Sequence, residues 1–239
     1  MDNIKIRVLG VGAFEFNIGG KRLFVDAFNS INPAEELTQG DIVICTHDDA
    51  DHFSVSKFPD MRDLDIIIIG PPSIIKQLIE NDKATIDHIK VIYSQNNKQP
   101  SFIEIDGLRI ISFGTPHFLD WKPIHNSYLI EFNHCKIYIT GDSYLTKDLK
   151  EIIGQVDVII CNLVDEGFIT GKENPNYAIH HHMSYLLNMI SDYKPQKIIG
   201  LHLINFDGTV NAYNMKKLID DYQFNDIIIP TEVNEIISI

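Results

Sequence analysis

The chain has 239 residues, of which 44% are hydrophobic and 22% are charged, and its formal net charge is −13. Acidic residues outnumber basic ones 33 to 20, so the sequence lacks the clustered Lys and Arg that binding to a nucleic-acid backbone requires. The composition is that of a globular protein with one sizeable core, and we expect a single domain over 1–239.

The sequence also indicates where the protein is found. No apolar run is long enough to span a bilayer, and the first residues lead directly into an alternating strand rather than a signal peptide. Cys45, Cys135 and Cys161 each lie in or beside an apolar run, and an odd number of core-like cysteines suits a reducing compartment. We therefore expect a cytoplasmic protein that contacts neither membrane nor nucleic acid.

The first half of the chain is predicted to consist mainly of short strands joined by tight turns. Alternating or continuous apolar residues indicate strands, and apolar residues three and four positions apart indicate a helix. Strands are predicted over 4–9, 13–17, 21–25, 41–45, 66–69, 89–93, 102–105 and 108–113. One helix is predicted over 73–81, with its apolar residues on one side.

The second half repeats this organisation with more helix. Strands are predicted over 127–132, 136–140, 156–161, 197–201 and 227–237, and helices over 145–153, 183–193 and 211–222. Strands come early in each half and helices come late. This order favours two β-sheets packed together with helices outside, rather than a doubly wound parallel sheet.

Potential metal ligands are concentrated directly after the buried run 41–45. The segment His47-Asp48-Asp49-Ala50-Asp51-His52 combines imidazoles with carboxylates, which is the ligand mixture that zinc and iron accept. Packing so many carboxylates together without a cation would cost repulsion and desolvation. The segment therefore predicts one wall of a metal site.

Three more candidate ligands follow predicted strands. His117 comes after the run 110–113, Asp142 after 136–139 and His202 after 198–201. Strand ends hold side chains more rigidly than loop tips, as a metal site requires. Four strands that each lead to a ligand of the right type indicate one shared site.

These residues resemble the motif of the metallo-β-lactamase superfamily, which is His-x-His-x-Asp-His after a strand, then His, Asp and His at later strand ends. Here it reads His47-x-Asp49-x-Asp51-His52, followed by the three strand-end residues above, and the resemblance covers nearly the whole chain. The Gly141-Asp142-Ser143 and His182-Met183 segments are most similar to the branch that contains L-ascorbate-6-phosphate lactonase.

The resemblance implies a layered α/β fold, an αββα sandwich of two packed mixed sheets with helices on both outer faces. It also implies two divalent metal ions, of zinc, manganese or iron, at one edge of the sheets. By motif position His47, Asp49 and His117 would hold one ion, Asp51, His52 and His202 would hold the other, and Asp142 would bridge them. Asp51 would also be catalytic, because it could orient the attacking water.

The function implied is hydrolysis of a small molecule, with a lactone or a phosphate-containing ester as the expected substrate and a metal-bridging hydroxide as the nucleophile. Asp49 departs from the family, which usually has His there. The flavodiiron reductases have a carboxylate at this position and use iron, but they carry a flavin domain that this chain is too short to hold. A di-iron redox protein and a non-catalytic metal- or ligand-sensing domain are the alternatives, and homo-oligomerisation is left open.

Several other polar residues have two interpretations. His180, His181 and His182 precede a predicted helix, where they could contact an anionic substrate or form a solvated run. Asp26 follows a strand and could orient a ligand imidazole or cap a turn.

A further group of polar residues is predicted to have no part in the metal site, or only an indirect one. Asp48 is predicted to be solvated, and the turn-like contexts of His88, His125 and His134 predict surface histidines. Asn162, Asp165 and Glu166 could line the cleft or belong to a loop.

Overall fold

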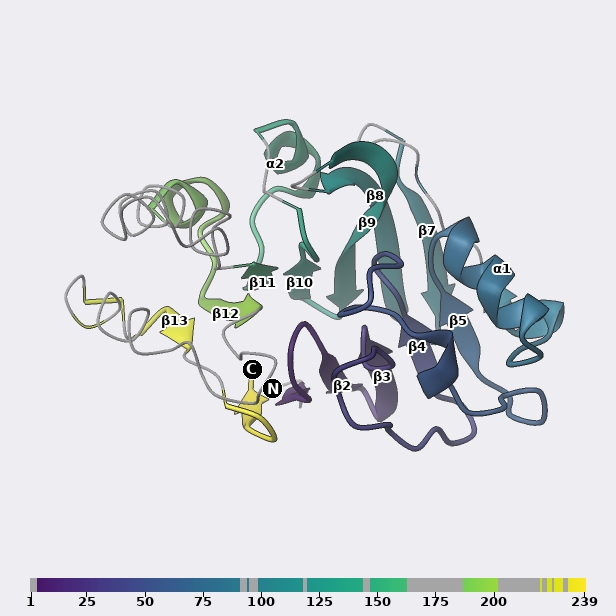
Figure 1. Ribbon diagram of the computed structural model, residues 1–239. Coiled ribbons are helices and arrows are strands. Elements are labelled where there is room, and N and C mark those ends of the chain that lie inside the picture. The colour runs from purple at the N-terminus through teal and green to yellow at the C-terminus, as the bar shows by residue number, and fades with distance from the viewer. Residues whose placement is uncertain are drawn as a thin grey trace, which may run out of the picture.

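Two β-sheets face each other and helices cover their outer faces, as the sequence predicts (Figure 1). The computed structural model describes residues 4–90, 94, 99–117, 120–143, 147–162, 187–201, 220, 223–224, 226–229 and 232–239. Each sheet has seven strands among these residues and mixes parallel with antiparallel pairs. The fold class predicted from the sequence is therefore confirmed.

The first sheet contains the N-terminal strands and the last strand of the chain. Its order is β14-β1-β2-β3-β4-β5-β6, antiparallel from β14 to β3 and parallel from β3 to β6. The bounds are β1 (Lys5–Val8), β2 (Phe14–Ile18), β3 (Lys21–Val25), β4 (Ile42–Ile44), β5 (Ile67–Ile69), β6 (Ile89–Lys90) and β14 (Ile236–Ser238).

The second sheet has the complementary arrangement. Its order is β13-β12-β11-β10-β9-β8-β7, parallel from β13 to β10 and antiparallel from β10 to β7. The bounds are β7 (Ser101–Ile105), β8 (Leu108–His117), β9 (Asp120–Phe132), β10 (Cys135–Ile139), β11 (Val158–Asn162), β12 (Lys197–Leu201) and β13 (Ile228–Ile229). Because β9 is antiparallel to both β8 and β10, the carboxyl ends of β8 and β10 lie at the same edge.

The helices cover the two outer faces. Helix α1 (Pro72–Glu80) begins with a proline in its first turn, where the missing N–H costs nothing, and it packs its apolar side on the first sheet. Helix α2 (Lys147–Ile153) and the helical residues 187–193 pack on the second sheet. Two short 3-10 turns, η1 (Val55–Lys57) and η2 (Ile86–His88), lie in loops of the first half.

The main core lies between the sheets, and side-chain alternation divides each strand between two cores. In β3, Leu23 and Val25 point into the inter-sheet core, whereas Phe24 points outward into the core beneath α1. Strands covered on both faces read as continuous apolar runs, which is why β4 and β11 were recognisable in the sequence.

Strands β8 and β9 are longer than the sequence predicts, and this changes the site. The predicted strand 108–113 continues to His117, and the predicted strand 127–132 begins already at Asp120. A register shift between Thr115 and His117 accommodates Pro116, which cannot donate to a regular ladder. The sequence pattern did not predict this extension because prolines and Gly114 are unfavourable in strands. The extension places His117 and His125 on strands.

The predicted strand 227–237 is wrong, because it is two strands in different sheets. Strand β13 pairs with β12, and β14 pairs with β1 of the other sheet. A turn before β14 contains Asn234 with φ of 67°, and its N–H bonds to the carbonyl of Val8. The crossing brings the two termini side by side in Figure 1.

Other sequence predictions are met within the described part of the chain. Residues 187–193 of the predicted helix 183–193 are helical, whereas residue 220 is the only described residue of the helix predicted over 211–222, so that helix stays a prediction. Cys45 and Cys161 are buried, Cys135 is partly exposed, and all three are free thiols. In the described ranges no helix is both long and apolar enough to cross a membrane.

The inter-sheet core should dominate stability. Ile110 of β8 is fully buried in the inter-sheet core, and its replacement by Ala should lower the free energy of unfolding by about 2–5 kcal/mol. The matched control is Ile86→Ala, because Ile86 is 68% exposed, and it should change stability by less than about 0.5 kcal/mol. Urea denaturation followed by circular dichroism measures both. Equal effects would contradict the placement of Ile110 in the core.

Candidate metal centre

The loop after β4 folds back on itself, so that closely spaced residues face one point. The carbonyl of Asp49 accepts hydrogen bonds from the N–H groups of His52, at 2.9 Å, and Phe53, at 2.8 Å. The strand that precedes the loop is held on both sides, since Asp26 N–H bonds to Ile44 and Cys45 N–H bonds to Ile69. The motif residues therefore project from a rigid turn.

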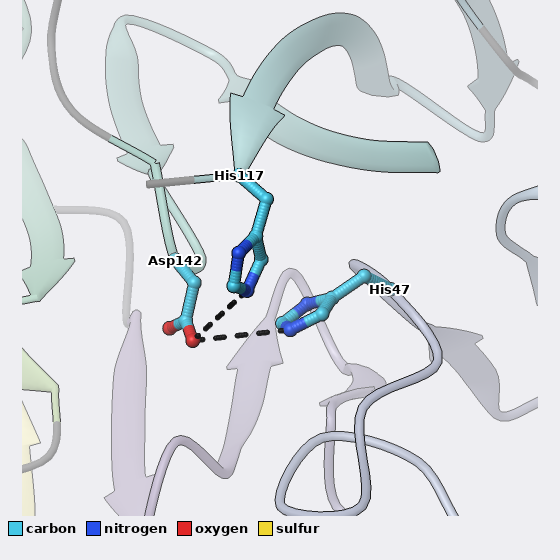
Figure 2. Close-up of side chains that lie close together, drawn as sticks. All are labelled: His47, His117 and Asp142. Carbon is cyan, nitrogen blue, oxygen red and sulfur yellow. Dashed lines mark ion pairs between the residues drawn. The ribbon is translucent and has the colours of Figure 1, made fainter. Parts of the chain in front are cut away.

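The first cluster of ligand atoms joins this loop to the second sheet. Figure 2 shows Asp142 and His117 facing His47, with Asp142 Oδ2 lying 3.6 Å from His117 Nε2 and 3.8 Å from His47 Nε2. Asp49 Oδ2 approaches the same two nitrogens, at 3.2 Å from His117 and 3.5 Å from His47. These are the four residues that the sequence assigns to the first ion and the bridge.

The second cluster lies on the other side of Asp142. Its Oδ1 atom is 3.2 Å from His52 Nε2, and Asp51 Oδ2 is 3.9 Å from the same nitrogen. One carboxylate oxygen of Asp142 therefore faces each cluster. Within each of the triads His47–His117–Asp142 and Asp51–His52–Asp142, ligand atoms lie within 4.8 Å of one another. The structure thus brings together every motif residue except His202, which lies outside the described residues.

The residues around the clusters differ sharply in exposure. His47, His52 and Asp142 are buried, whereas the side chain of Asp49 is 56% exposed and that of Asp51 is 24% exposed. A solute would therefore approach from the side of the Asp49–Asp51 loop.

The donor set fits divalent metal ions. His47 Nε2 is buried and has no hydrogen-bond partner among the described residues, and the carboxylate oxygens nearest to it are too distant for a good hydrogen bond. Imidazole nitrogens and carboxylate oxygens are the ligands that zinc, manganese and iron take. A metal ion would satisfy the buried nitrogen and neutralise the carboxylates together.

A buried aspartate beneath the clusters fixes the orientation of two imidazoles. Asp26 accepts bonds from Thr46 N–H at 2.8 Å and from the Thr46 hydroxyl at 2.6 Å, and it pairs with His52 Nδ1 at 2.8 Å. The Thr46 hydroxyl also lies 2.9 Å from His47 Nδ1. Both Nδ1 atoms are thereby engaged away from the clusters, which directs both Nε2 atoms into them. Of the two interpretations of Asp26, the structure shows the contact with an imidazole that the first one predicts, and the role of His52 as a metal ligand stays a prediction.

The electrostatics of the clusters favour positive charge. Burial alone would lower the pKa of His52, but the carboxylates of Asp142 and Asp26 outweigh it and raise that pKa well above its ordinary value. The nearby carboxylate of Asp142 raises the pKa of His117, and the nearby imidazole of His47 lowers the pKa of Asp49. The field that stabilises an imidazolium here would equally stabilise a metal dication.

The prediction that His125 is a surface residue is wrong. His125 lies in β9, is only 1% exposed, and packs its ring 4.9 Å from the ring of His47, centroid to centroid. Its Nε2 accepts the backbone N–H of Asp142 at 2.9 Å, and burial, with the positive field of His47, lowers its pKa well below the ordinary value. The signal missed was the two-residue alternation, which runs from Leu129 back through Ser127 to His125.

The remaining polar candidates separate into two groups. Asp48 and His134 are exposed, as predicted. The side chains of His88 and Asn162, and the whole of Asp165, Glu166, His180, His181, His182 and His202, lie outside the described residues. Substrate contact by the three consecutive histidines and metal binding by His202 therefore stay predictions.

Comparisons with known proteins agree with this geometry. A family model described as the Beta-lactamase superfamily domain matches residues 5–202. A curated relative from Thermococcus onnurineus, named UPF0173 metal-dependent hydrolase, is 29% identical. The alignment covers 98% of this chain and 100% of that relative.

Two solved structures show the same fold. A possible metal-dependent hydrolase from Veillonella parvula is 16% identical, with a TM-score of 0.68 over 100% of this chain and 99% of that one. CmlA, a diiron beta-hydroxylase from Streptomyces venezuelae, is 11% identical, with a TM-score of 0.67 over 100% of this chain and 54% of that one. At these identities the likeness shows the fold alone.

Asp142 provides the sharpest test of the two clusters. Asp142→Asn keeps the size of the side chain but removes the charge that both clusters share, so both should lose affinity for metal. We expect bound zinc or manganese to fall by at least about 10-fold in equilibrium dialysis followed by elemental analysis. Asp148→Asn, on the exposed start of α2, is the control and should bind as the unmodified protein does. Unchanged binding by Asp142→Asn would remove it from the site.

Proposed function

The chain belongs to the beta-lactamase superfamily and is a metal-dependent hydrolase of the metallo-β-lactamase fold, and on that premise we propose that it cleaves a lactone or a phosphate-containing ester of a small molecule with two divalent metal ions. The observation that carries this proposal is the division of Asp142 between two ligand clusters, one oxygen toward each. A single ion would need only one of them.

Two ions held side by side have a defined chemical use. Divalent ions bound at the two clusters would supply a hydroxide nucleophile at neutral pH and would polarise the bond to be cleaved. The chain's own part is to hold the ligand atoms: His47 and His117 face one oxygen of Asp142, and His52 faces the other. The proposed ions are zinc, manganese or iron.

Asp51 is the residue we propose as catalytic. Its carboxylate lies at the edge of the second cluster, 3.9 Å from His52 Nε2, and is partly exposed, so it can contact both the cluster and an incoming solute. A carboxylate in that place can accept a proton from the attacking water and orient it. Asp49, the other acidic residue of the loop, faces the first cluster instead.

The substrate class follows from charge and from the resemblance to a lactonase branch. The protein as a whole is strongly acidic, with a net charge of −13. A metal centre reverses that field locally and attracts an anionic group. A small phosphorylated substrate or a lactone therefore suits the site better than a polyanion such as nucleic acid.

The second candidate is a di-iron redox protein, and Asp49 is the observation that favours it. A carboxylate in the first cluster makes the site richer in hard oxygen ligands, and CmlA shows that a diiron enzyme can share this fold. CmlA is nearly twice as long as the part that this chain matches, with 54% of it covered. Relatives that match over 84–100% of their own length carry hydrolase names instead, which supports hydrolysis.

Turnover assays separate the candidates. Protein loaded with zinc, manganese or iron should hydrolyse at least one member of a panel of lactones and phosphate esters in air, without an electron donor. His202→Ala should abolish that turnover and lower metal content, because His202 is proposed to complete the second cluster. Oxygen or nitric-oxide reduction with an artificial donor, and no hydrolysis, would establish the redox candidate. If the protein binds metal but shows neither activity, the remaining interpretation is a non-catalytic metal- or ligand-sensing domain.

Asp49 should set metal preference. Asp49→His replaces a carboxylate by a neutral nitrogen ligand, which removes one negative charge and one hard oxygen from the first cluster. We expect the variant to shift from manganese or iron toward zinc in competition dialysis. Asp48→His, at the exposed neighbouring position, is the control and should keep the original preference. If the two variants show the same preference, Asp49 is not a ligand.

A further inference from the structure

His125 contacts the backbone of Asp142, the residue whose carboxylate the two clusters share. Strand β9 places it opposite Thr115 of β8, and its ring reaches across to the turn after β10, where it accepts the backbone N–H of Asp142 at 2.9 Å. The other ring nitrogen, Nδ1, lies 2.9 Å from the Thr115 hydroxyl. His125 of β9 therefore connects β8, through Thr115, to the backbone of Asp142 in the turn after β10.

These two hydrogen bonds fix which nitrogen carries the proton. A backbone N–H can only donate, so His125 Nε2 must be the unprotonated acceptor. The ring proton then lies on Nδ1 and is donated to the Thr115 oxygen. Each ring nitrogen has one partner, and neither is available to a metal ion.

The turn that carries Asp142 is shaped around the ring. Gly141 has φ of +54°, and a side-chain carbon added there would lie 2.5 Å from His125 Nε2 and 3.2 Å from the Thr46 Cβ. Glycine is required both for the backbone conformation and for the close approach. The ring of His125 thus seats directly on the Gly141–Asp142 peptide.

The ring also supports the imidazoles of the first cluster. Its centroid lies 4.9 Å from that of His47 and 6.0 Å from that of His117. Movement of His125 would therefore shift both the carboxylate and the two imidazoles that face it.

We propose that His125 is a positioning residue that holds the Asp142 backbone, and so sets how the shared carboxylate divides between the two metal positions. The proposal rests on the metal centre of the proposed function. Asp142 Oδ1 lies 3.2 Å from His52 Nε2, and Oδ2 lies 3.6 Å from His117 Nε2, so rotation or displacement of the residue would favour one cluster at the expense of the other. Loss of the hydrogen bond that fixes its peptide should thus weaken binding of the two ions as a pair.

The test compares metal binding by variants that differ in one hydrogen-bonding function. His125→Phe keeps a ring but has no acceptor, and should lower affinity for Zn²⁺ or Mn²⁺ by about 10–100-fold, as loss of a supporting partner usually does. His125→Gln restores an acceptor near the position of Nε2 and should recover most of that affinity. Isothermal titration with each metal measures affinity and stoichiometry, and circular dichroism checks that each variant is folded.

Two further measurements make the test decisive. Thr115→Val removes only the acceptor of the Nδ1 proton and should weaken binding less than His125→Phe does. Nitrogen NMR of the unmodified protein should show His125 protonated on Nδ1 alone, which holds even if His125→Phe fails to fold. His134→Gln, on the exposed β9–β10 turn, is the control and should bind metal normally.

The outcomes separate the inference from the function on which it rests. An unmodified protein that binds no metal would overturn both. Metal binding by the unmodified protein, with equal affinity in His125→Phe or a proton on Nε2 of His125, would overturn the inference and leave the metal centre intact. Weakened binding in His125→Phe without recovery in His125→Gln would also overturn it, because the ring would then act only through its packing.

Discussion

The carboxylate of Asp142 is the constraint on which the rest of the structure depends. It is buried, and its oxygens face imidazoles from two directions at 3.2 and 3.6 Å. A buried carboxylate is costly unless charge or hydrogen bonds compensate it, and several kcal/mol of desolvation penalty would otherwise oppose folding around it. Cations in the adjoining clusters would supply that compensation, which links the stability of this edge of the fold to its chemistry.

The fold supplies rigidity to this edge from both sheets. The backbone carbonyl of Thr46, two residues after β4 of the first sheet, accepts the backbone N–H of Asn126 in β9 of the second sheet. Nearby, the Tyr128 hydroxyl donates to the Cys45 carbonyl at 2.9 Å. The two halves of the site are thus joined by hydrogen bonds across the sandwich, and the inter-sheet core beneath them resists separation. Ligands that arise far apart in the sequence therefore keep a fixed spacing.

Much of this arrangement could be predicted from the sequence because it depends on local patterns. Buried strands such as β4 are continuous apolar runs, and the His47–His52 segment combines the imidazoles and carboxylates that zinc and iron accept as ligands. What could not be predicted depends on pairing between distant segments. The continuation of β8 beyond Phe113, and of β9 to residues before Ser127, depends on pairing between these two strands rather than on local preference, and it places His125 opposite Thr115. The division of the C-terminal segment between two sheets has the same origin, since each short strand is defined by the edge it joins.

The central claim is that two metal ions share Asp142, and anomalous diffraction from crystals of metal-loaded protein tests it most directly. Data collected on both sides of the absorption edge of the bound metal should give two peaks. One should lie between Asp142 Oδ2 and the imidazoles of His47 and His117, and the other between Asp142 Oδ1 and His52. A single peak in one cluster, or metal bound only away from Asp142, would contradict the account.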